Sequence, residues 1–131
     1  MPSPRLRHVN RELRQLLLTI GDELRRIEIG LPIAGDLRAV DVELKRPGCR
    51  IANELIVRLG DVQAQLRGAL LKLRDGGYDR LIVVVADTHA NRAALRLAWD
   101  AVSGSFPITS RAALAALRQG HDPGGNAIIL L

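Results

Sequence analysis

Residues 61–86 read DVQAQLRGALLKLRDGGYDRLIVVVA, and the two halves of this stretch have different patterns. In the first half, apolar side chains recur at the three- and four-residue spacing of one helix face, and Asp61 can cap the helix start. Gly76 and Gly77 tolerate the positive φ that often ends a helix. In the second half, residues 81–86 form an unbroken apolar run, which is typical of a parallel strand buried on both faces. The stretch therefore predicts a helix followed by the central strand of a sheet.

The residues before this stretch predict three antiparallel strands. Residues 27–33 alternate between large aliphatic residues and other residues, which is the two-residue period of a strand with one buried face. A second strand is expected over residues 36–44, where a bulge between Ala39 and Val40 would explain a shift in the apolar alternation. An Arg-Pro-Gly turn then leads into a third strand over residues 50–59. Together the three strands predict a meander.

The residues after the stretch continue to alternate between helix and strand. The expected elements are a helix over 91–102, a short strand over 106–108, a helix over 110–118 capped by Ser110, and a last strand over 127–131. An amphipathic helix is expected at the start, over residues 9–26. This order predicts an α/β fold with a mixed β-sheet flanked by helices. We expect an N-terminal helical segment over residues 1–26, as a linker or a remnant, and a single α/β domain over residues 27–131.

The composition limits the chemistry that the chain can support. The chain has 131 residues, 47% of them hydrophobic and 25% charged, which is enough for one sizeable core. Its one cysteine, Cys49, excludes an internal disulfide and a cysteine zinc cluster, so a reducing, cytoplasmic setting is expected. No apolar run approaches the roughly 20 residues that cross a bilayer, so no membrane partner is expected. Three aromatic residues are too few for base-stacking platforms.

The formal charge of +5 is carried almost entirely by arginine. An arginine excess permits contact with nucleic acid, because guanidinium groups pair with phosphates. Arginine-rich coding in a GC-rich genome explains the same excess without any nucleic-acid partner. The charge alone therefore leaves DNA binding open.

Acidic side chains gather on the second and third predicted strands and at the start of the following helix. They are Asp36, Asp41, Glu54 and Asp61, with Gln63 beside them. Neighbouring strands lie about 4.8 Å apart, so carboxylates that face the same way on both strands could share a divalent cation such as Mg²⁺. The expected metal ligands are Asp36, Asp41 and Glu54. The alternative is structural: Asp36 pairs with Arg38, or Asp41 with Arg58, and the ion pairs stabilise the sheet.

The acids and the order of elements resemble the αβββαβ core of the PD-(D/E)XK nuclease superfamily. The resemblance implies a restriction-endonuclease-like core with a C-terminal αβ extension, in which an acid on the second strand and an acid-x-lysine on the third hold a metal. Asp36 or Asp41 would take the place of the first acid and Glu54 that of the second. The superfamily's lysine would stand two residues after Glu54, where this chain has Ile56. An aliphatic side chain cannot activate a water molecule, and Lys72 on the next helix is the lysine that could substitute.

A longer resemblance covers residues 28–131. The strings LPIAGDLRAVD, RLGDVQAQLRGALLKLRDGGYDRLIVVVADTHANRAALR and FPITSRAALAALRQGHDPGGNAIILL resemble the C-terminal domain of actinobacterial helix-turn-helix transcriptional regulators of the Xre (Cro/C1) type. That family carries GDLRAWD on the second strand and VEAETRLRDVQ on the third strand and the next helix. The matching positions are Gly35, Asp36, Arg38 and Asp41 in the first motif and Glu54, Arg58, Asp61 and Gln63 in the second. Ile56 and Val57 stand where the family has an acid and a threonine.

These resemblances imply functions of different classes. Because Ile56 replaces the strand lysine, we expect a non-catalytic effector or interaction domain related to transcriptional regulators, with DNA or a DNA-binding protein as its partner. The alternative is a Mg²⁺-dependent nuclease acting on DNA, with Asp41, Glu54 and Lys72 as catalytic residues. The side chains expected around that site are Arg38, Arg58, Asp61 and Gln63. A homodimer formed through the opening helix is a third hypothesis. The residues before the first strand are too few for a helix-turn-helix module, so direct reading of the major groove is not expected.

A polar corner follows the predicted central strand and contains Asp87, Thr88, His89, Asn91 and Arg92. Open sheets bind ligands at the carboxyl ends of their strands, so this corner is a candidate site. The simpler interpretation is that Asp87 and Thr88 cap the next helix.

Overall fold

The computed structural model describes residues 25–30, 34–36 and 38–131. Most of the helix expected over residues 9–26 falls outside this part of the chain, and so does the dimer interface proposed on it. Arg25 and Arg26 are described, and they belong to the first strand rather than to a helix. The expected helix end at residue 26 is therefore wrong.

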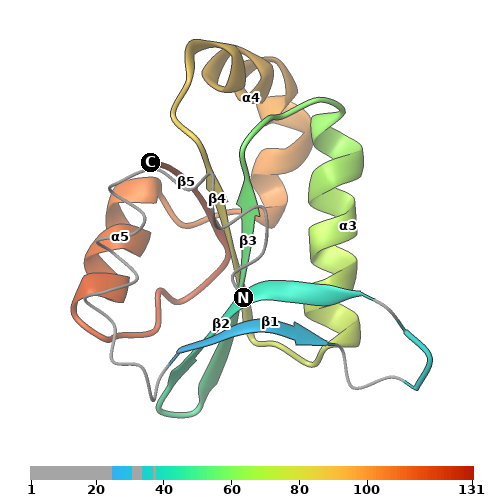
Figure 1. The fold of residues 1–131 in the computed structure, drawn as a ribbon. Helices are drawn as coiled ribbons and strands as arrows, with labels where there is room; N and C mark the ends of the chain where they lie inside the picture. Colours follow the sequence, from blue (N-terminus) through green and yellow to red (C-terminus); the bar gives the residue numbers. More distant parts are fainter. Residues whose placement is uncertain (1–24, 31–33, 37) are drawn as a thin grey trace.

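Five strands form one mixed sheet in the order β1-β2-β3-β4-β5 (Figure 1). They span Arg25–Gly30 (β1), Ala39–Arg46 (β2), Cys49–Ile56 (β3), Arg80–Val85 (β4) and Ala127–Leu130 (β5). The first three strands are antiparallel neighbours, whereas β4 runs parallel to both β3 and β5. The predicted α/β class with a mixed sheet is confirmed.

The described part of the chain has three α-helices, which flank the sheet on both faces. They are α3 (Val62–Asp75), α4 (His89–Val102) and α5 (Ser110–Arg118), and a 3-10 turn, η2 (Ser103–Ser105), follows α4. Figure 1 shows α3 and α4 on one side of the sheet and α5 on the other. None of these helices combines the length and the apolar character that a membrane-spanning helix needs.

α3 begins and ends where its sequence predicts. The Asp61 carboxylate accepts a hydrogen bond from the Ala64 N–H at 3.1 Å, which satisfies one of the exposed donors of the first turn. At the other end, the Gly76 N–H donates to the Lys72 carbonyl, and Gly77 then takes a positive φ of 68°. The helix therefore crosses from β3 to the parallel strand β4 with both ends capped.

A two-residue turn joins β2 to β3. Arg46 pairs with Cys49, so Pro47 and Gly48 make the turn. Gly48 has a φ of 67°, which costs glycine little. β3 ends at Ile56 rather than at residue 59 as expected, because the chain then turns toward α3. The hairpin itself is as predicted.

β1 and β2 pair without a bulge. Their register is the same at both ends, with Gly30 opposite Ala39 and Arg25 opposite Leu44. The predicted bulge between Ala39 and Val40 is wrong. β2 starts only at Ala39, so the change in apolar alternation marks the start of the strand and not a defect inside it.

The segment between β4 and β5 differs from the prediction in two details. Residues 106–108 form an isolated bridge between Ile108 and Ala127 and not the expected strand, since Pro107 has no N–H to donate to a ladder. The N-cap of α5 is Thr109, whose hydroxyl accepts from the Ala112 N–H at 3.1 Å. The expected cap, Ser110, is the first helical residue.

The core lies in two layers, one on each face of the sheet. The layer under α3 and α4 contains Leu66, Ala69, Leu81, Val83, Val85 and Phe106. The layer under α5 contains Leu44, Ile51, Ile82, Ala113, Leu117 and Ile129. β4 supplies both layers, and its burial on both faces is as predicted.

Replacing a core leucine of α3 should destabilise the fold. Leu66 is 2% exposed, so Leu66→Ala should lower the free energy of unfolding by about 2–5 kcal/mol through lost burial and a residual cavity. Leu97→Ala is the matched control, because Leu97 lies on α4 and is 90% exposed, and it should change stability by less than about 0.5 kcal/mol. Urea unfolding followed by circular dichroism measures both. Equal effects of the two substitutions would contradict the packing of α3 described above.

Candidate active site

Asp41 and Glu54 lie across the β2–β3 hairpin from each other. The register pairs Glu43 with Ala52, so the next positions on that face, Asp41 and Glu54, come opposite one another beneath α3. Both are 5% exposed. The turn between the two strands therefore sets the register that brings the two acids together.

Asp41 is fixed by the backbone of the neighbouring strand. Its Oδ2 accepts a hydrogen bond from the Leu55 N–H at 2.9 Å, within the buried part of the hairpin. The Asp41 carboxyl also hydrogen-bonds to that of Glu54. One carboxylate of the pair is thus held by a main-chain donor and points toward the other.

Lys72 reaches the same pair from α3. Its Nζ lies 3.3 Å from Glu54 Oε1 and 3.4 Å from Oε2. Leu66, Ala69 and Lys72 are each three residues apart, so they share the helix face that packs on the sheet. The amine that β3 lacks at Ile56 is therefore present at Glu54, supplied by the next helix.

The surroundings of Glu54 favour its protonated form. Burial, and next the negative charge of Asp41, raise the pKa of Glu54 to about 7, although the Lys72 amine opposes the shift. Two buried carboxylates side by side repel each other unless a proton or a cation lies between them. The pair can therefore release a proton when a divalent cation binds.

A cavity of about 390 Å³ opens beside Glu54 and Lys72. Its α3 wall carries Ala64, Gly68 and Ala69, whose small side chains leave the space open. Arg58 and Gln65 complete its polar lining. A substrate group that enters this cavity would meet one carboxyl group and two cationic side chains.

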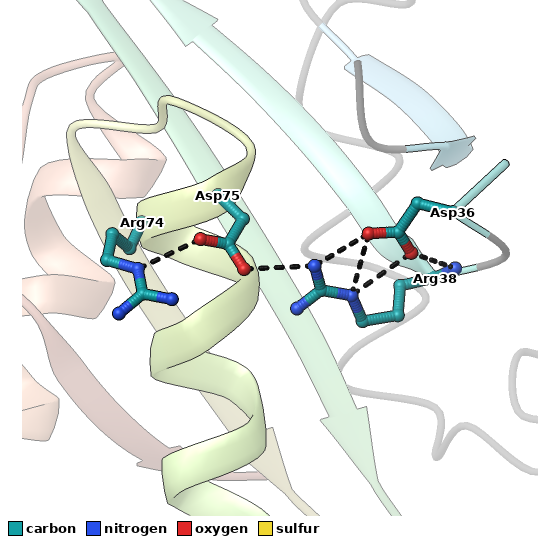
Figure 2. A network of polar contacts seen from close by, with 4 residues as sticks. All are labelled: Asp36, Arg38, Arg74 and Asp75. Atoms are coloured by element: carbon teal, nitrogen blue, oxygen red, sulfur yellow. Dashed lines mark hydrogen bonds and ion pairs between the residues drawn. The ribbon is translucent and has the colours of Figure 1, made fainter. Parts of the chain in front are cut away.

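Asp36 takes part in a separate network (Figure 2). Arg38 lies between two carboxylates, with its Nη2 2.6 Å from Asp36 Oδ2 and 2.9 Å from Asp75 Oδ2. Arg74 binds the other oxygen of Asp75 at 2.9 Å. The hydrogen bonds from Arg38 lower the pKa of Asp36, and those from Arg74 and Arg38 lower the pKa of Asp75. This network ties the segment before β2 to the end of α3.

The three expected metal ligands are not all brought together. Residues 34–36 and 38–131 contain no group of three or more His, Cys, Asp or Glu side chains arranged to hold a metal ion. Asp36 is engaged by Arg38, as the structural alternative predicts, whereas Asp41 and Glu54 are adjacent. A cation at this site would therefore have two carboxylates of the described residues as its ligands.

The remaining predicted site residues divide by role. Arg58 lines the cavity beside Glu54. Asp61 is occupied as the N-cap of α3. Gln63 lines a different groove, between α3 and α4.

Gln65 and Asn91 hold the loop that carries Arg58, a role that the sequence analysis missed. Gln65 accepts from the Gly60 N–H at 2.9 Å and donates to the Arg58 carbonyl at 3.2 Å. Asn91 is 2% exposed, accepts from the Leu59 N–H at 2.9 Å, and donates to the carbonyls of Val57 and Ala86. The sequence signal that could have pointed to Asn91 was its place in the polar corner after β4.

The interpretation of that corner as a helix cap is correct for Thr88, whose hydroxyl accepts from the Asn91 N–H at 3.1 Å.

A third acid on this face, Glu43, was also missed. It is fully buried and accepts from Arg50 Nε at 2.9 Å, and the Arg50 guanidinium lies 4.5 Å from the centroid of the Tyr78 ring. Alternation along β2 puts Glu43 on the same face as Asp41. The Arg50 contact gives Glu43 a counter-charge within the fold.

Stability should depend on pH through Glu54. The pKa of Glu54 is about 7 in the folded protein against an ordinary value of 4.5, so between these values the folded state binds more protons than the unfolded state. The stabilisation is therefore complete below about pH 4.5 and is lost as the pH rises through about 7, by up to about 3 kcal/mol. The glutamine of Glu54→Gln cannot titrate, so the free energy of unfolding of this variant should not show this fall as the pH rises. Urea unfolding with EDTA at about pH 5 and about pH 8 measures the difference.

Asp100→Asn is the control for that measurement, because it removes an exposed carboxylate from α4. It should leave the pH dependence of the wild-type protein unchanged. If the free energy of unfolding changed equally with pH in the wild-type protein and in Glu54→Gln, the link between the burial of Glu54 and its protonation would be ruled out.

Comparisons of the chain with protein-family models, with curated proteins and with solved structures found no match. The resemblances to PD-(D/E)XK nucleases and to regulator domains therefore remain predictions. The functional argument depends on the contacts of Asp41, Glu54 and Lys72.

Proposed function

We propose that this chain is a divalent-cation-dependent nuclease of the PD-(D/E)XK type that acts on DNA. The observation that carries the proposal is the 3.3 Å contact between Lys72 Nζ and Glu54 Oε1. The expectation of a non-catalytic domain rested on the missing lysine at Ile56. An amine at Glu54 from α3 removes that ground, because the chemistry needs the group at the site and not at a given sequence position.

Asp41 and Glu54 are the residues that would hold the cation. Their carboxylate oxygens are the hard ligands that Mg²⁺ prefers. Burial, and next the charge of Asp41, raise the pKa of Glu54, and a bound cation would oppose both effects. A bound Mg²⁺ would neutralise charge on the phosphoryl oxygens and lower the pKa of the attacking water. Glu54 must release its proton first, so we expect affinity to rise with pH through about 7.

The cationic side chains have separate tasks in this mechanism. Lys72 donates hydrogen bonds at the carboxylate pair, where it can orient the attacking water and stabilise developing negative charge. Arg58, which also lines the cavity, can pair with a phosphate of the substrate. The net charge of +5 favours association with a polyanion such as DNA.

A non-catalytic effector or interaction domain is the second candidate. Burial favours it, because Asp41 and Glu54 are each 5% exposed and Glu54 already has an ion-pair partner, Lys72, within the protein. Buried charge clusters of this kind also occur for structural reasons. Such a domain would reach DNA through a partner that carries the DNA-binding module.

DNA cleavage distinguishes the two functions. The purified chain, incubated with supercoiled plasmid or single-stranded DNA and Mg²⁺ or Mn²⁺, should cut the DNA, and EDTA should prevent the cleavage. Glu54→Ala should abolish the activity, and Lys72→Ala should reduce it by about 100-fold because the amine is lost from the site. Lys45→Ala is the matched control, since Lys45 is the other lysine of the chain and is exposed on β2, and it should retain activity.

Calorimetric titration with Mn²⁺ gives an independent reading. Binding that Glu54→Gln removes, together with DNA left intact, would favour the effector function over the nuclease. Cleavage that survives Glu54→Ala would point to a contaminating enzyme and would contradict the proposed site.

A further inference from the structure

A second and larger cavity, of about 700 Å³, lies at the β5 end of the sheet. Its walls come from α4, from the connection that leads into α5, and from β5, the strand that Figure 1 shows beside the C-terminus. It shares no lining residue with the cavity beside Glu54. Its volume is within the range of pockets that enclose small organic molecules.

The interior of this cavity is apolar. Phe106 and Ile128 are buried at its base, and Leu95, Ile108 and Leu130 are partly buried around them. Trp99, a residue that is 41% exposed, adds its indole ring to the lining. Binding of a ligand with an apolar body would therefore remove hydrophobic surface of both the ligand and the cavity from water.

The rim of the cavity carries two arginine side chains. Arg92 and Arg96 lie on the same face of α4 as Trp99, because the three positions are separated by three or four residues. Asp100 is the acid of the lining. Arg92 is 3.4 Å from Asp87, whereas Arg96 makes no ion pair with any residue of the described chain. Arg96 is therefore the guanidinium of the lining that can pair with an anion.

We propose that this cavity binds a small amphipathic anion, a carboxylate with an aliphatic or aromatic body. The body packs between Trp99 and the base at Phe106 and Ile128, and the carboxylate pairs with Arg96. The start of α5 at Ser110 lies in the lining, and its helix dipole adds to the attraction for the anion. This binding site goes beyond the nuclease function and does not depend on it.

Titration with decanoate below its micellar concentration tests the proposal on the full chain. Trp99 is the only tryptophan of the chain and lines the cavity, so its fluorescence reports occupancy directly. Decanoate should produce a saturable change that fits one molecule per chain. Decanol should bind more weakly, and decyltrimethylammonium should give no saturable change, because Arg96 cannot pair with a cation. Equal responses to all three compounds, or none to decanoate, would overturn the proposal.

The arginine variants test the role of the rim. Arg96→Gln should weaken decanoate binding by about tenfold through the loss of a charge-assisted contact, and it should leave decanol binding unchanged. Arg118→Gln is the matched control, since Arg118 is exposed on the last turn of α5 and outside the cavity lining, and it should bind as the wild-type protein does. Decanoate binding that Arg96→Gln leaves unchanged would overturn the assignment of the anion to the rim. Glu54→Ala should bind decanoate normally, so a failure of the nuclease function leaves this test valid.

Discussion

Two carboxylates, those of Asp41 and Glu54, face each other under a helix, and the free-energy cost of burying them is the constraint on which the site depends. Desolvation and mutual repulsion raise the pKa of Glu54, and Lys72 opposes the rise. Lys72 reaches Glu54 only because α3 packs its Leu66 and Ala69 face on the sheet. The charge state of the site is therefore tied to the packing of α3. A sequence that lost this packing would lose the amine together with the core.

Side-chain amides, and not regular structure, hold the loop between β3 and α3. Gln65 binds it from the helix that follows, and Asn91 binds it from α4, which lies more than one element further along the chain. The hydrogen bonds of Asn91 are buried or partly buried and those of Gln65 are exposed, and together they satisfy main-chain groups that no strand partner reaches. Arg58 is consequently presented to the cavity on a backbone that two helices restrain. Such support from outside the site is what keeps a binding group in one position.

The fold could be predicted from the sequence wherever the spacing of apolar residues is compatible with only one kind of secondary structure. The helical spacing and the apolar run of residues 61–86 predicted α3 and β4, and the hairpin register then places Asp41 opposite Glu54. The sequence named Lys72 only as the lysine that could substitute for the one missing at Ile56, because a lysine late on an amphipathic helix is more often exposed to solvent. Its three-residue spacing from Ala69 was visible in the sequence. The pairing of Asp36 with Arg38 was one of the predicted alternatives, whereas the second carboxylate that Arg38 binds, Asp75, could not be predicted because it is distant in the sequence. Local patterns carry no information on such long-range partners.

The central position of β4 has a consequence for how the molecule opens. Its backbone is hydrogen-bonded to β3 on one side and to β5 on the other, and its side chains fill both core layers. Fraying at a sheet edge or at a helix end leaves these amides closed to water. Their protons therefore exchange with solvent only when the whole described domain unfolds, so the exchange rate of this one strand reports the global stability.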